Sequence, residues 1–307
     1  MTSDIPLYAG IDGGGTKTLA VVVDAAGHER GRHAAGSGNF AAVGVARAAE
    51  NVRAAIEGAM AAAGNGTQPA AAWIGLAGVD RPEDVDLLLP QLSPLAGVVR
   101  ISNDAELALT ALDNALGVAV IAGTGSIALG RDASGRLVRA GGWGHVIGDE
   151  GSGWEMGRLA LQAVARATDG RGPGTSLVRA VIKHWNLRNT DGIYGILYPD
   201  TDKALVAGLT SVVLAEAGAG DVVAKDILDH AAEEIALLTL TVGEQLTFPN
   251  AGMPLALAGG ILVNESGFRA MVLERVRQRR APGQVAVVQD APLSAARAAH
   301  DLLLGDV

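Results

Sequence analysis

The 307-residue sequence contains no cysteine. Disulfides, zinc sites with thiolate ligands, iron–sulfur clusters and a cysteine nucleophile are therefore excluded. Basic residues are also scarce, because 24 Lys and Arg stand against 33 Asp and Glu, which gives a formal net charge of −9. A general nucleic-acid-binding protein usually carries a net positive charge or a basic stripe. We therefore expect no nucleic-acid partner.

Long apolar runs are missing as well. The longest stretch without a charged residue is Gln245 to Asn264, and prolines and glycines interrupt it, which is unfavourable for a membrane helix. Met1 to Pro6 has no basic region of the kind that opens a signal peptide. A cysteine-free chain also suits a reducing compartment. We expect a cytoplasmic protein without a membrane partner, and its 49% hydrophobic residues predict a sizeable core.

The chain opens with a repeated plan of strands and turns. Leu7 to Ile11 predicts a strand, Asp12 to Thr16 a turn, Leu19 to Val23 a second strand and Asp24 to Gly27 a hairpin turn. The same plan recurs over Val118 to Gly141.

The recurrence has a fixed spacing of 108 residues. Gly15-Thr16 corresponds to Gly123-Thr124, and Asp24 corresponds to Asp132. We interpret this as a duplication that produces two similar halves, each with a Gly-Thr hairpin. Strands alternate with helical patterns along the chain, so the predicted fold class is α/β.

Between and after these hairpins the pattern predicts the remaining elements. Strands are expected over 71–76, 98–102, 255–258 and 285–288. Helices are expected over 41–63, from Asp104, and over 151–168, 175–185, 203–217, 222–246, 266–280 and 293–304, the last closed by Gly305.

Two glycine-rich turns are candidate phosphate sites. In Asp12-Gly13-Gly14-Gly15-Thr16-Lys17, glycines let successive N–H groups surround an anion, and Asp12 could hold hydrated Mg²⁺. The turn is not a P-loop, because a strand and not a helix follows it. Gly123-Thr124-Gly125-Ser126 is its partner in the second half. A plain glycine-rich hairpin is the alternative for each.

Four further places follow predicted strands or loops and allow two interpretations each. Asp104 either caps a helix or acts as a general base that accepts a proton from a substrate hydroxyl. Asn39 either binds a hydroxyl or caps the next helix, and Gly78 is similarly ambiguous. Gly259-Gly260 either lets a flat base lie on the backbone or forms a tight strand–helix turn.

The most unusual stretch is the loop from Gly141 to Gly153. Gly142-Trp143-Gly144-His145 sets an aromatic ring among small residues, and Asp149 follows. This combination suits a sugar, which offers an apolar ring face beside hydroxyl groups. The alternative is a glycine-rich loop with Trp143 in the core.

Together these residues resemble the sugar-kinase branch of the actin/hexokinase/Hsp70 ATPase superfamily, and more closely the N-acetylglucosamine kinases and the BadF/BadG/BcrA/BcrD ATPase family. The resemblance covers nearly the whole chain. It implies two ribonuclease H-like (actin-like ATPase) domains around a central cleft. One is residues 1–117, on which a C-terminal helix over 291–307 packs, and the other is residues 118–290, which carries the adenosine site.

The resemblance also implies a chemistry: ATP and Mg²⁺ as cofactors, and transfer of a phosphoryl group to the 6-hydroxyl of N-acetylglucosamine with Asp104 as general base. Nucleotide contacts are implied for Gly13, Gly14, Gly15, Thr16, Lys17, Gly123, Thr124, Gly125, Gly208, Gly259 and Gly260. Sugar contacts are implied for Asn39, Gly78, Asp104, Ser126, Gly142, Trp143, Gly144, His145 and Asp149. Many relatives are dimers, so a homodimer is also considered.

The sequence departs from the mammalian-type enzymes at Leu76 to Val79, where those carry a Ser and paired Gly, and at Ile127, where they carry an Asn. Glucosamine, N-acetylmuramic acid or glucose are therefore alternative substrates. A switch ATPase that activates radical enzymes is a different class, but its iron–sulfur cluster needs cysteine. A DNA-binding repressor would need a segment for which residues 1–6 leave no room. A non-catalytic sugar sensor is a further alternative.

Overall fold

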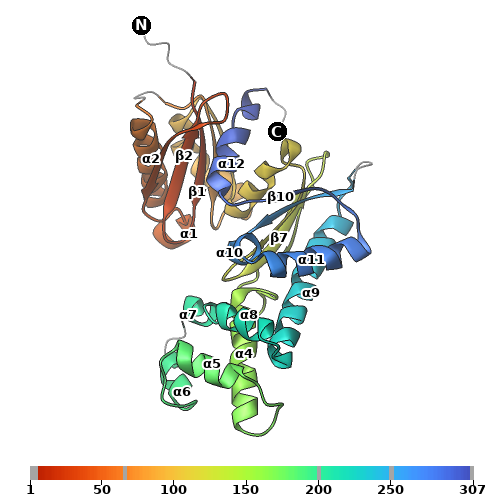
Figure 1. The fold of residues 1–307 in the computed structure, drawn as a ribbon. Helices are drawn as coiled ribbons and strands as arrows, with labels where there is room; N and C mark the ends of the chain where they lie inside the picture. Colours follow the sequence, from red (N-terminus) through yellow and green to blue (C-terminus); the bar gives the residue numbers. More distant parts are fainter. Residues whose placement is uncertain (1–5, 65–67, 199–201, 249–251, 305–307) are drawn as a thin grey trace. The chain divides into compact units, whose positions relative to one another are not determined.

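The computed structural model describes residues 6–64, 68–198, 202–248 and 252–304. The chain divides into two units (Figure 1). The first unit comprises residues 1–119 and 285–307, and the second comprises residues 120–284. Two five-stranded sheets organise the molecule.

The sheet of the first unit has the order β3-β2-β1-β4-β5. β1 pairs antiparallel with β2 and parallel with β4, and β4 pairs parallel with β5. β1, β4 and β5 therefore end at the same edge of the sheet. The strands are β1 (Tyr8–Gly13), β2 (Thr18–Val23), β3 (Glu29–Ala35), β4 (Ala71–Leu76) and β5 (Val98–Asn103).

Helices of the first unit lie close against this sheet. A Cβ at Gly31 of β3 would overlap the carbonyl oxygen of Ala59, and one at Gly10 of β1 would overlap that of Pro292, so both helices need glycine at the contact. The helices are α1 (Phe40–Val43), α2 (Val45–Ala62), α3 (Pro82–Leu92) and α12 (Ala291–Ala298), with 3₁₀ helices η1 (Ser93–Leu95), η2 (Asp104–Ala111), η3 (Asp113–Ala115) and η4 (Asp301–Leu303).

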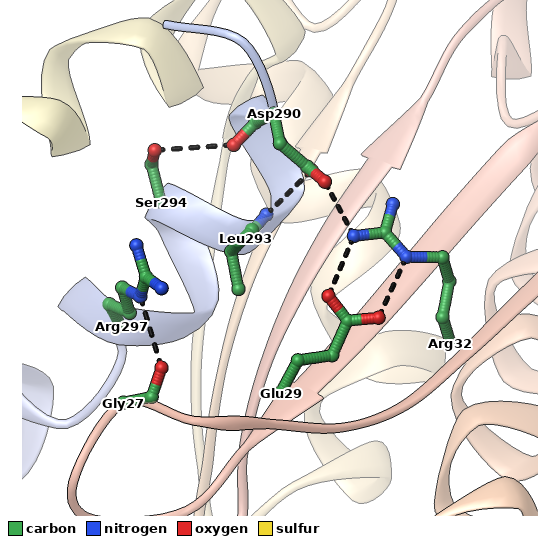
Figure 2. Close-up of polar contacts among 7 residues, drawn as sticks. All are labelled: Gly27, Glu29, Arg32, Asp290, Leu293, Ser294 and Arg297. Atoms are coloured by element: carbon green, nitrogen blue, oxygen red, sulfur yellow. Dashed lines mark hydrogen bonds and ion pairs between the residues drawn. The ribbon is translucent and has the colours of Figure 1, made fainter.

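Polar contacts join the start of α12 to β3, and the last turn of α12 to the hairpin turn that precedes β3 (Figure 2). Asp290 accepts a hydrogen bond from Arg32, whose guanidinium also donates to both oxygens of Glu29 at 2.9 Å. Arg297 Nε donates to the carbonyl oxygen of Gly27 at 3.1 Å. Chain segments from the two ends of the sequence are thus fixed to each other within the first unit.

The second sheet has the order β10-β9-β6-β7-β8, which read from the other edge repeats the plan of the first. Its strands are β6 (Gly117–Ala122), β7 (Ser126–Arg131), β8 (Leu137–Gly141), β9 (Met253–Ala258) and β10 (Pro282–Val287). The helices are α4 (Gly153–Thr168), α5 (Leu177–His184), α6 (Gly192–Leu197), α7 (Lys203–Ala207), α8 (Thr210–Gly218), α9 (Val222–Glu244), α10 (Gly260–Asn264) and α11 (Ser266–Arg279).

The α/β class and the duplication are confirmed. In both halves the predicted Asp turn has the same hydrogen bonds. The Asp24 carboxylate accepts from the backbone N–H groups two and four residues later, at 2.9 and 3.0 Å. The Asp132 carboxylate accepts from the corresponding pair, at 3.0 and 3.3 Å. Two identical local solutions at a spacing of 108 residues are the strongest structural sign of the repeat.

Several predicted helices differ from the observed ones. Gly44, with φ of 82°, divides the predicted helix over 41–63 into α1 and α2. The predicted helix over 203–217 is divided at Gly208 and Leu209 into α7 and α8. The helix from Asp104 is a 3₁₀ helix. The last predicted helix ends at Ala298, and Gly305 lies outside the described residues.

Candidate active site

The first glycine-rich turn connects β1 to β2. The turn is shorter than predicted and begins later, because β1 continues through Asp12 to Gly13. It is closed by a hydrogen bond that Gly14 N donates to Lys17 O at 3.0 Å. Gly15 has no positive φ, and a Cβ placed there would meet nothing within 4 Å. Neither backbone strain nor packing thus requires glycine at this exposed position. Access of an anion to the backbone N–H groups is a requirement that would explain it.

Asn39 and Gly78 lie next to each other beside this turn. Gly38 N donates to Gly14 O at 3.1 Å, which holds the loop of Asn39 against the turn. A Cβ at Gly78 would lie 3.3 Å from Asn39 Oδ1, and Gly78 has φ of 90°. Asn39 Oδ1 accepts from the N–H of Ala42 at 3.3 Å and so caps α1. The structure therefore shows the capping role of Asn39 and places it beside the second predicted sugar contact.

Asp104 begins η2 directly after β5. Its neighbour Asn103 caps this helix, because Asn103 Oδ1 accepts from Ala105 N at 2.9 Å. The amide of Asn103 is itself fixed by donating to Val79 O at 3.1 Å and to Asp80 Oδ1 at 3.2 Å. Asp104 Oδ1 accepts from the same N–H of Ala105 at 2.9 Å. The helix therefore has a cap other than Asp104, which the sequence interpretation missed.

Burial raises the pKa of Asp104, and the negative charge of Asp80 adds to this effect. Asp12 at the end of β1 behaves similarly. Burial, followed by the charge of Asp104, raises the pKa of Asp12 to about 6, while Lys17 opposes the rise and Asp290 adds to it. Two interacting carboxyl groups with raised pKa values at one sheet edge are typical of a functional site.

Asp12 is also the candidate ligand for a cation. No group of three or more His, Asp or Glu among the described residues could hold a metal ion directly. Mg²⁺ retains several waters and needs only one or two protein carboxylates. The half-buried Asp12, with Asp104 and Asp290 adding negative charge, fits such an ion bound through water.

In the second unit, the second glycine-rich turn meets the predicted adenosine motif. Gly123 N donates to Gly125 O at 2.9 Å and closes the turn. A Cβ at Gly123 would lie 3.6 Å from Gly260 N. Gly259 has φ of 86°, and a Cβ there would overlap the carbonyl oxygen of Ala122. Glycine is therefore required where the motif crosses the end of β6.

The start of α4 closes the same turn from another side. Gly153 N donates to Gly123 O at 2.8 Å, and Trp154 N donates to Thr124 O at 3.2 Å. Thr210 Oγ1, at the start of α8, donates to Gly153 O at 3.4 Å. The corner between α7 and α8 that contains Gly208 is therefore tied to this helix start.

The predicted sugar loop leaves its aromatic ring in solvent. Trp143 is 65% exposed, so the alternative of a core Trp143 is wrong. The guanidinium of Arg139 lies 5.2 Å from the centre of the Trp143 ring. His145 packs edge-on against Trp154, with 4.9 Å between ring centres. Gly142 and Gly144 both have positive φ. An exposed ring on such a loop is available to a ligand.

Asp149 differs from the exposed part of this loop, because it is only 4% exposed. Its Oδ1 accepts from Ser126 N at 3.2 Å, and its Oδ2 forms an ion pair with Lys203 Nζ at 2.6 Å. Lys203 is a partner that the predicted site omitted. No local pattern could reveal it, because the two residues are 54 positions apart.

The structure thus brings the predicted residues of each unit together at one edge of its sheet, where ligands bind in many α/β folds. In the described part of the chain, no helix combines the length and hydrophobicity that a membrane crossing requires.

Two sheets of one plan, each with a glycine turn between its first two strands, define a duplicated actin-like ATPase fold. The chain belongs to the BadF/BadG/BcrA/BcrD ATPase family, whose sequence pattern matches residues 9–296.

Several proteins that resemble this chain are named as amino-sugar kinases. The chain is 39% identical over 195 residues to the N-acetylmuramic acid/N-acetylglucosamine kinase of Clostridium acetobutylicum, a match that spans 62% of this chain and 64% of that protein, slightly less than two thirds. It is 33% identical over 270 residues to the N-acetyl-D-glucosamine kinase of Dictyostelium discoideum, over 83% of this chain and 85% of that protein. A solved structure from Chromobacterium violaceum, proposed to be an N-acetylglucosamine kinase, has a TM-score of 0.71 and 27% identity, and the match covers 95% of this chain and 98% of that one.

Proposed function

We propose that the protein is an ATP-dependent kinase that transfers the γ-phosphoryl group to the 6-hydroxyl of N-acetylglucosamine, with Asp104 as general base. The observation that carries the proposal is the half-buried Asp104 carboxyl, whose pKa is raised by burial at the edge where β1, β4 and β5 end. The names of the relatives support a sugar kinase, and the family supports the use of ATP.

In this mechanism Asp104 accepts the proton of the attacking hydroxyl. A carboxylate with a raised pKa is a stronger base, provided that it is ionised at the working pH. The N–H groups of Gly14 and Gly123 close their own turns. The neighbouring N–H groups of Gly15 to Lys17 and of Thr124 and Gly125 donate hydrogen bonds to phosphate oxygens, which stabilises the charge that develops during transfer. Gly208, Gly259 and Gly260 contact the nucleotide.

Asp12 would hold Mg²⁺ through water in this proposal. When bound, the ion would offset the negative charge of the phosphates. Burial is the main cause of the raised pKa of Asp12, and the negative charges of Asp104 and Asp290 that add to it also favour a nearby cation, which supports this assignment.

Each unit carries its own candidate sugar contacts. Asn39 and Gly78 contribute from the first unit. The second contributes Ser126, Gly142, Trp143, Gly144, His145 and Asp149. The exposed Trp143 ring offers a face to the apolar side of the sugar, and Asp149 accepts from sugar hydroxyls.

A coupled assay of ADP release tests the proposal. Mg·ATP is supplied with N-acetylglucosamine, glucosamine, N-acetylmannosamine, N-acetylmuramic acid or glucose, with a no-sugar control. Release that depends on N-acetylglucosamine is the expected result. Sugar-independent hydrolysis, or none, would contradict the proposal and favour a switch ATPase or a sugar sensor.

A kinase of glucosamine or N-acetylmuramic acid is the second candidate. Ile127 favours it, because it stands where the mammalian-type enzymes carry an Asn and it has no hydrogen-bonding group. Its side chain packs against the sugar loop, since a Cβ at Gly142 would lie 2.7 Å from Ile127 Cδ1. The sugar panel distinguishes the two candidates by which substrate has the highest kcat/KM.

The cellular location, the domain boundaries and the oligomeric state are proposals as well. We place the protein in the cytoplasm and assign the domains to residues 1–117 with 291–307 and to residues 118–290. A homodimer is proposed by analogy with the family. Sedimentation analysis tests the dimer, and a single species of monomer mass would contradict it.

A further inference from the structure

An ion pair between Asp149 and Lys203 lies directly behind the second glycine-rich turn. Asp149 Oδ2 and Lys203 Nζ are 2.6 Å apart, with side-chain exposures of 5% and 32%. Removing a carboxylate from water is costly unless a counter-charge and hydrogen bonds replace the lost hydration. Lys203 supplies that counter-charge from the partly exposed side.

The other carboxylate oxygen contacts the turn itself. Oδ1 of Asp149 accepts from Ser126 N at 3.2 Å and would lie 2.7 Å from a Cβ at Gly125. Asp149 also has φ of 63°, a backbone conformation that is rare for residues other than glycine and is often found at functional sites. The carboxylate is thus held in one orientation by both its backbone and its two partners.

Lys203 is itself held in place. It is the first residue of α7, whose N-terminus is capped because Ala204 N donates to Asp202 Oδ1 at 2.8 Å. Val206 is 1% exposed, and its carbonyl oxygen lies where a Cβ at Gly157 of α4 would be. α7 is therefore packed tightly on α4, the helix whose first residues close the turn.

We infer that Lys203 is a positioning residue that acts through Asp149 and thereby sets the affinity for the sugar. The inference rests on the proposed function, in which Asp149 accepts hydrogen bonds from sugar hydroxyls. An ionised carboxylate has about four acceptor sites. Lys203 and Ser126 N occupy two of these, which leaves acceptor capacity for hydroxyl groups and fixes the direction in which it points.

Three substitutions at exposed or partly exposed lysines test the inference. Lys203→Met removes the charge and keeps the apolar stem, Lys203→Arg keeps the charge, and Lys225→Met on α9 is a control at an exposed position. Lys203→Met should raise the sugar KM by about tenfold or more, because a charge-assisted contact to a buried carboxylate is lost. The ATP KM should change by less than about twofold, Lys203→Arg should restore most of the sugar affinity, and Lys225→Met should behave as the unmodified protein.

A double-mutant cycle separates action through Asp149 from action elsewhere. In an Asp149→Asn background, Lys203→Met should change the sugar KM by less than about twofold, because coupled residues are not additive. Equal increases in the KM of sugar and ATP, an unchanged sugar KM, or an independent effect in the Asp149→Asn background would each overturn the inference. If Lys203→Met is too unstable to purify, Lys203→Gln provides the same comparison.

Thermal unfolding of the same variants measures the coupling between Lys203 and Asp149 without relying on catalytic activity. Non-additive changes in Tm for Lys203→Met and Asp149→Asn are expected, and additive changes would overturn the inference whatever the sugar assay gives. Absence of sugar-dependent ADP release in the unmodified protein would instead contradict the proposed function.

Discussion

β2 and β7 are separated by a constant 108 positions, since Thr18 corresponds to Ser126 and Val23 to Arg131. β1 and β6 are separated by 109, because the first turn spans 14–17 and the second only 123–125. With this offset Asp12 corresponds to Ile121. The duplicated strands therefore agree in plan, but β6 carries an isoleucine where β1 carries the carboxylate that precedes its turn.

The acids that both halves share have a structural role. Asp24 and Asp132 each accept hydrogen bonds within their own turn. The acids that only one half carries lie at the candidate site. The first unit has Asp12 and Asp104, and the second has Asp149 paired with Lys203. Duplication thus explains the scaffold, whereas the chemistry lies in positions where the halves diverged.

The largest effect on stability is expected at Gly259, and Gly15 in the other half provides the contrast. Gly259→Ala should destabilise the protein by at least about 2 kcal/mol, because φ is positive and the new Cβ would overlap Ala122 O. Gly15→Ala should change stability by less than about 0.5 kcal/mol, since its Cβ would meet nothing within 4 Å. Urea unfolding measures both, and equal losses would contradict the steric argument.

Gly15→Ala has a second expected outcome, in ATP binding. If the turn holds phosphates, the added methyl group should raise the ATP KM by about tenfold while Tm stays constant. An unchanged ATP KM would indicate that this glycine serves no ligand.

A smaller effect is expected when Asp12 is replaced by Asn. The pKa of Asp12 is raised to about 6 in the folded protein, above the value of 3.8 for a free side chain. Between these values the folded state binds more protons than the unfolded state, so stability falls as pH rises from about 4 to about 6. Above about pH 6 the destabilisation by the ionised Asp12 carboxylate persists. Asp12→Asn should therefore stabilise the ligand-free protein at pH 8 by about 1–2 kcal/mol, after allowance for partial exposure.

Urea unfolding at several pH values checks whether Asp12→Asn stabilises or destabilises the protein. Asp86→Asn, at an exposed position on α3, is the matched control and should leave the pH dependence unchanged. Destabilisation by Asp12→Asn at pH 8 would contradict the assignment of an unfavourable buried charge. The same variant should lose activity if Asp12 holds Mg²⁺.

The smallest loss of stability is expected at the two Asp turns, and it should be similar in both halves. Asp24→Ala and Asp132→Ala each remove an acceptor from two backbone N–H groups, so each should lower Tm by a few degrees. Each Asp also has further partners, Arg30 for Asp24 and Ser134 Oγ and Thr247 N for Asp132, so neither turn is expected to lose markedly more. A loss at only one of the two turns would show that the repeated hydrogen bonds are not equivalent.

Local patterns were sufficient for much of the fold. Apolar and β-branched runs predicted the strand regions, and the shared Asp turns predicted the duplication. α3 was missed although Pro82, Glu83 and Asp84 give it a regular helix start, so its signal was available. The division at Gly44 was missed because a glycine inside a helical pattern does not reveal a positive φ. The division at Gly208 gave no such signal, because Gly208 keeps a helical φ of −59°.

The site was predictable only where its residues are contiguous. The two glycine-rich turns and the Trp143 loop are local motifs. Capping by Asn103 depends on Val79 O, and the Asp149 ion pair depends on Lys203, so both require the tertiary fold. Whether Asp104 caps a helix or serves as a base was likewise a question about its neighbours.

Turnover by Asp104→Asn tests the central claim, that the first unit supplies the base, most directly. Asn keeps the size of the side chain, and Asn103 continues to cap η2. With N-acetylglucosamine and Mg·ATP, kcat should fall by about 10²–10⁴-fold, while calorimetric binding of sugar and nucleotide changes little and Asp86→Asn behaves normally. A kcat close to that of the unmodified protein would contradict the account and leave Asp104 as a structural residue at a helix start.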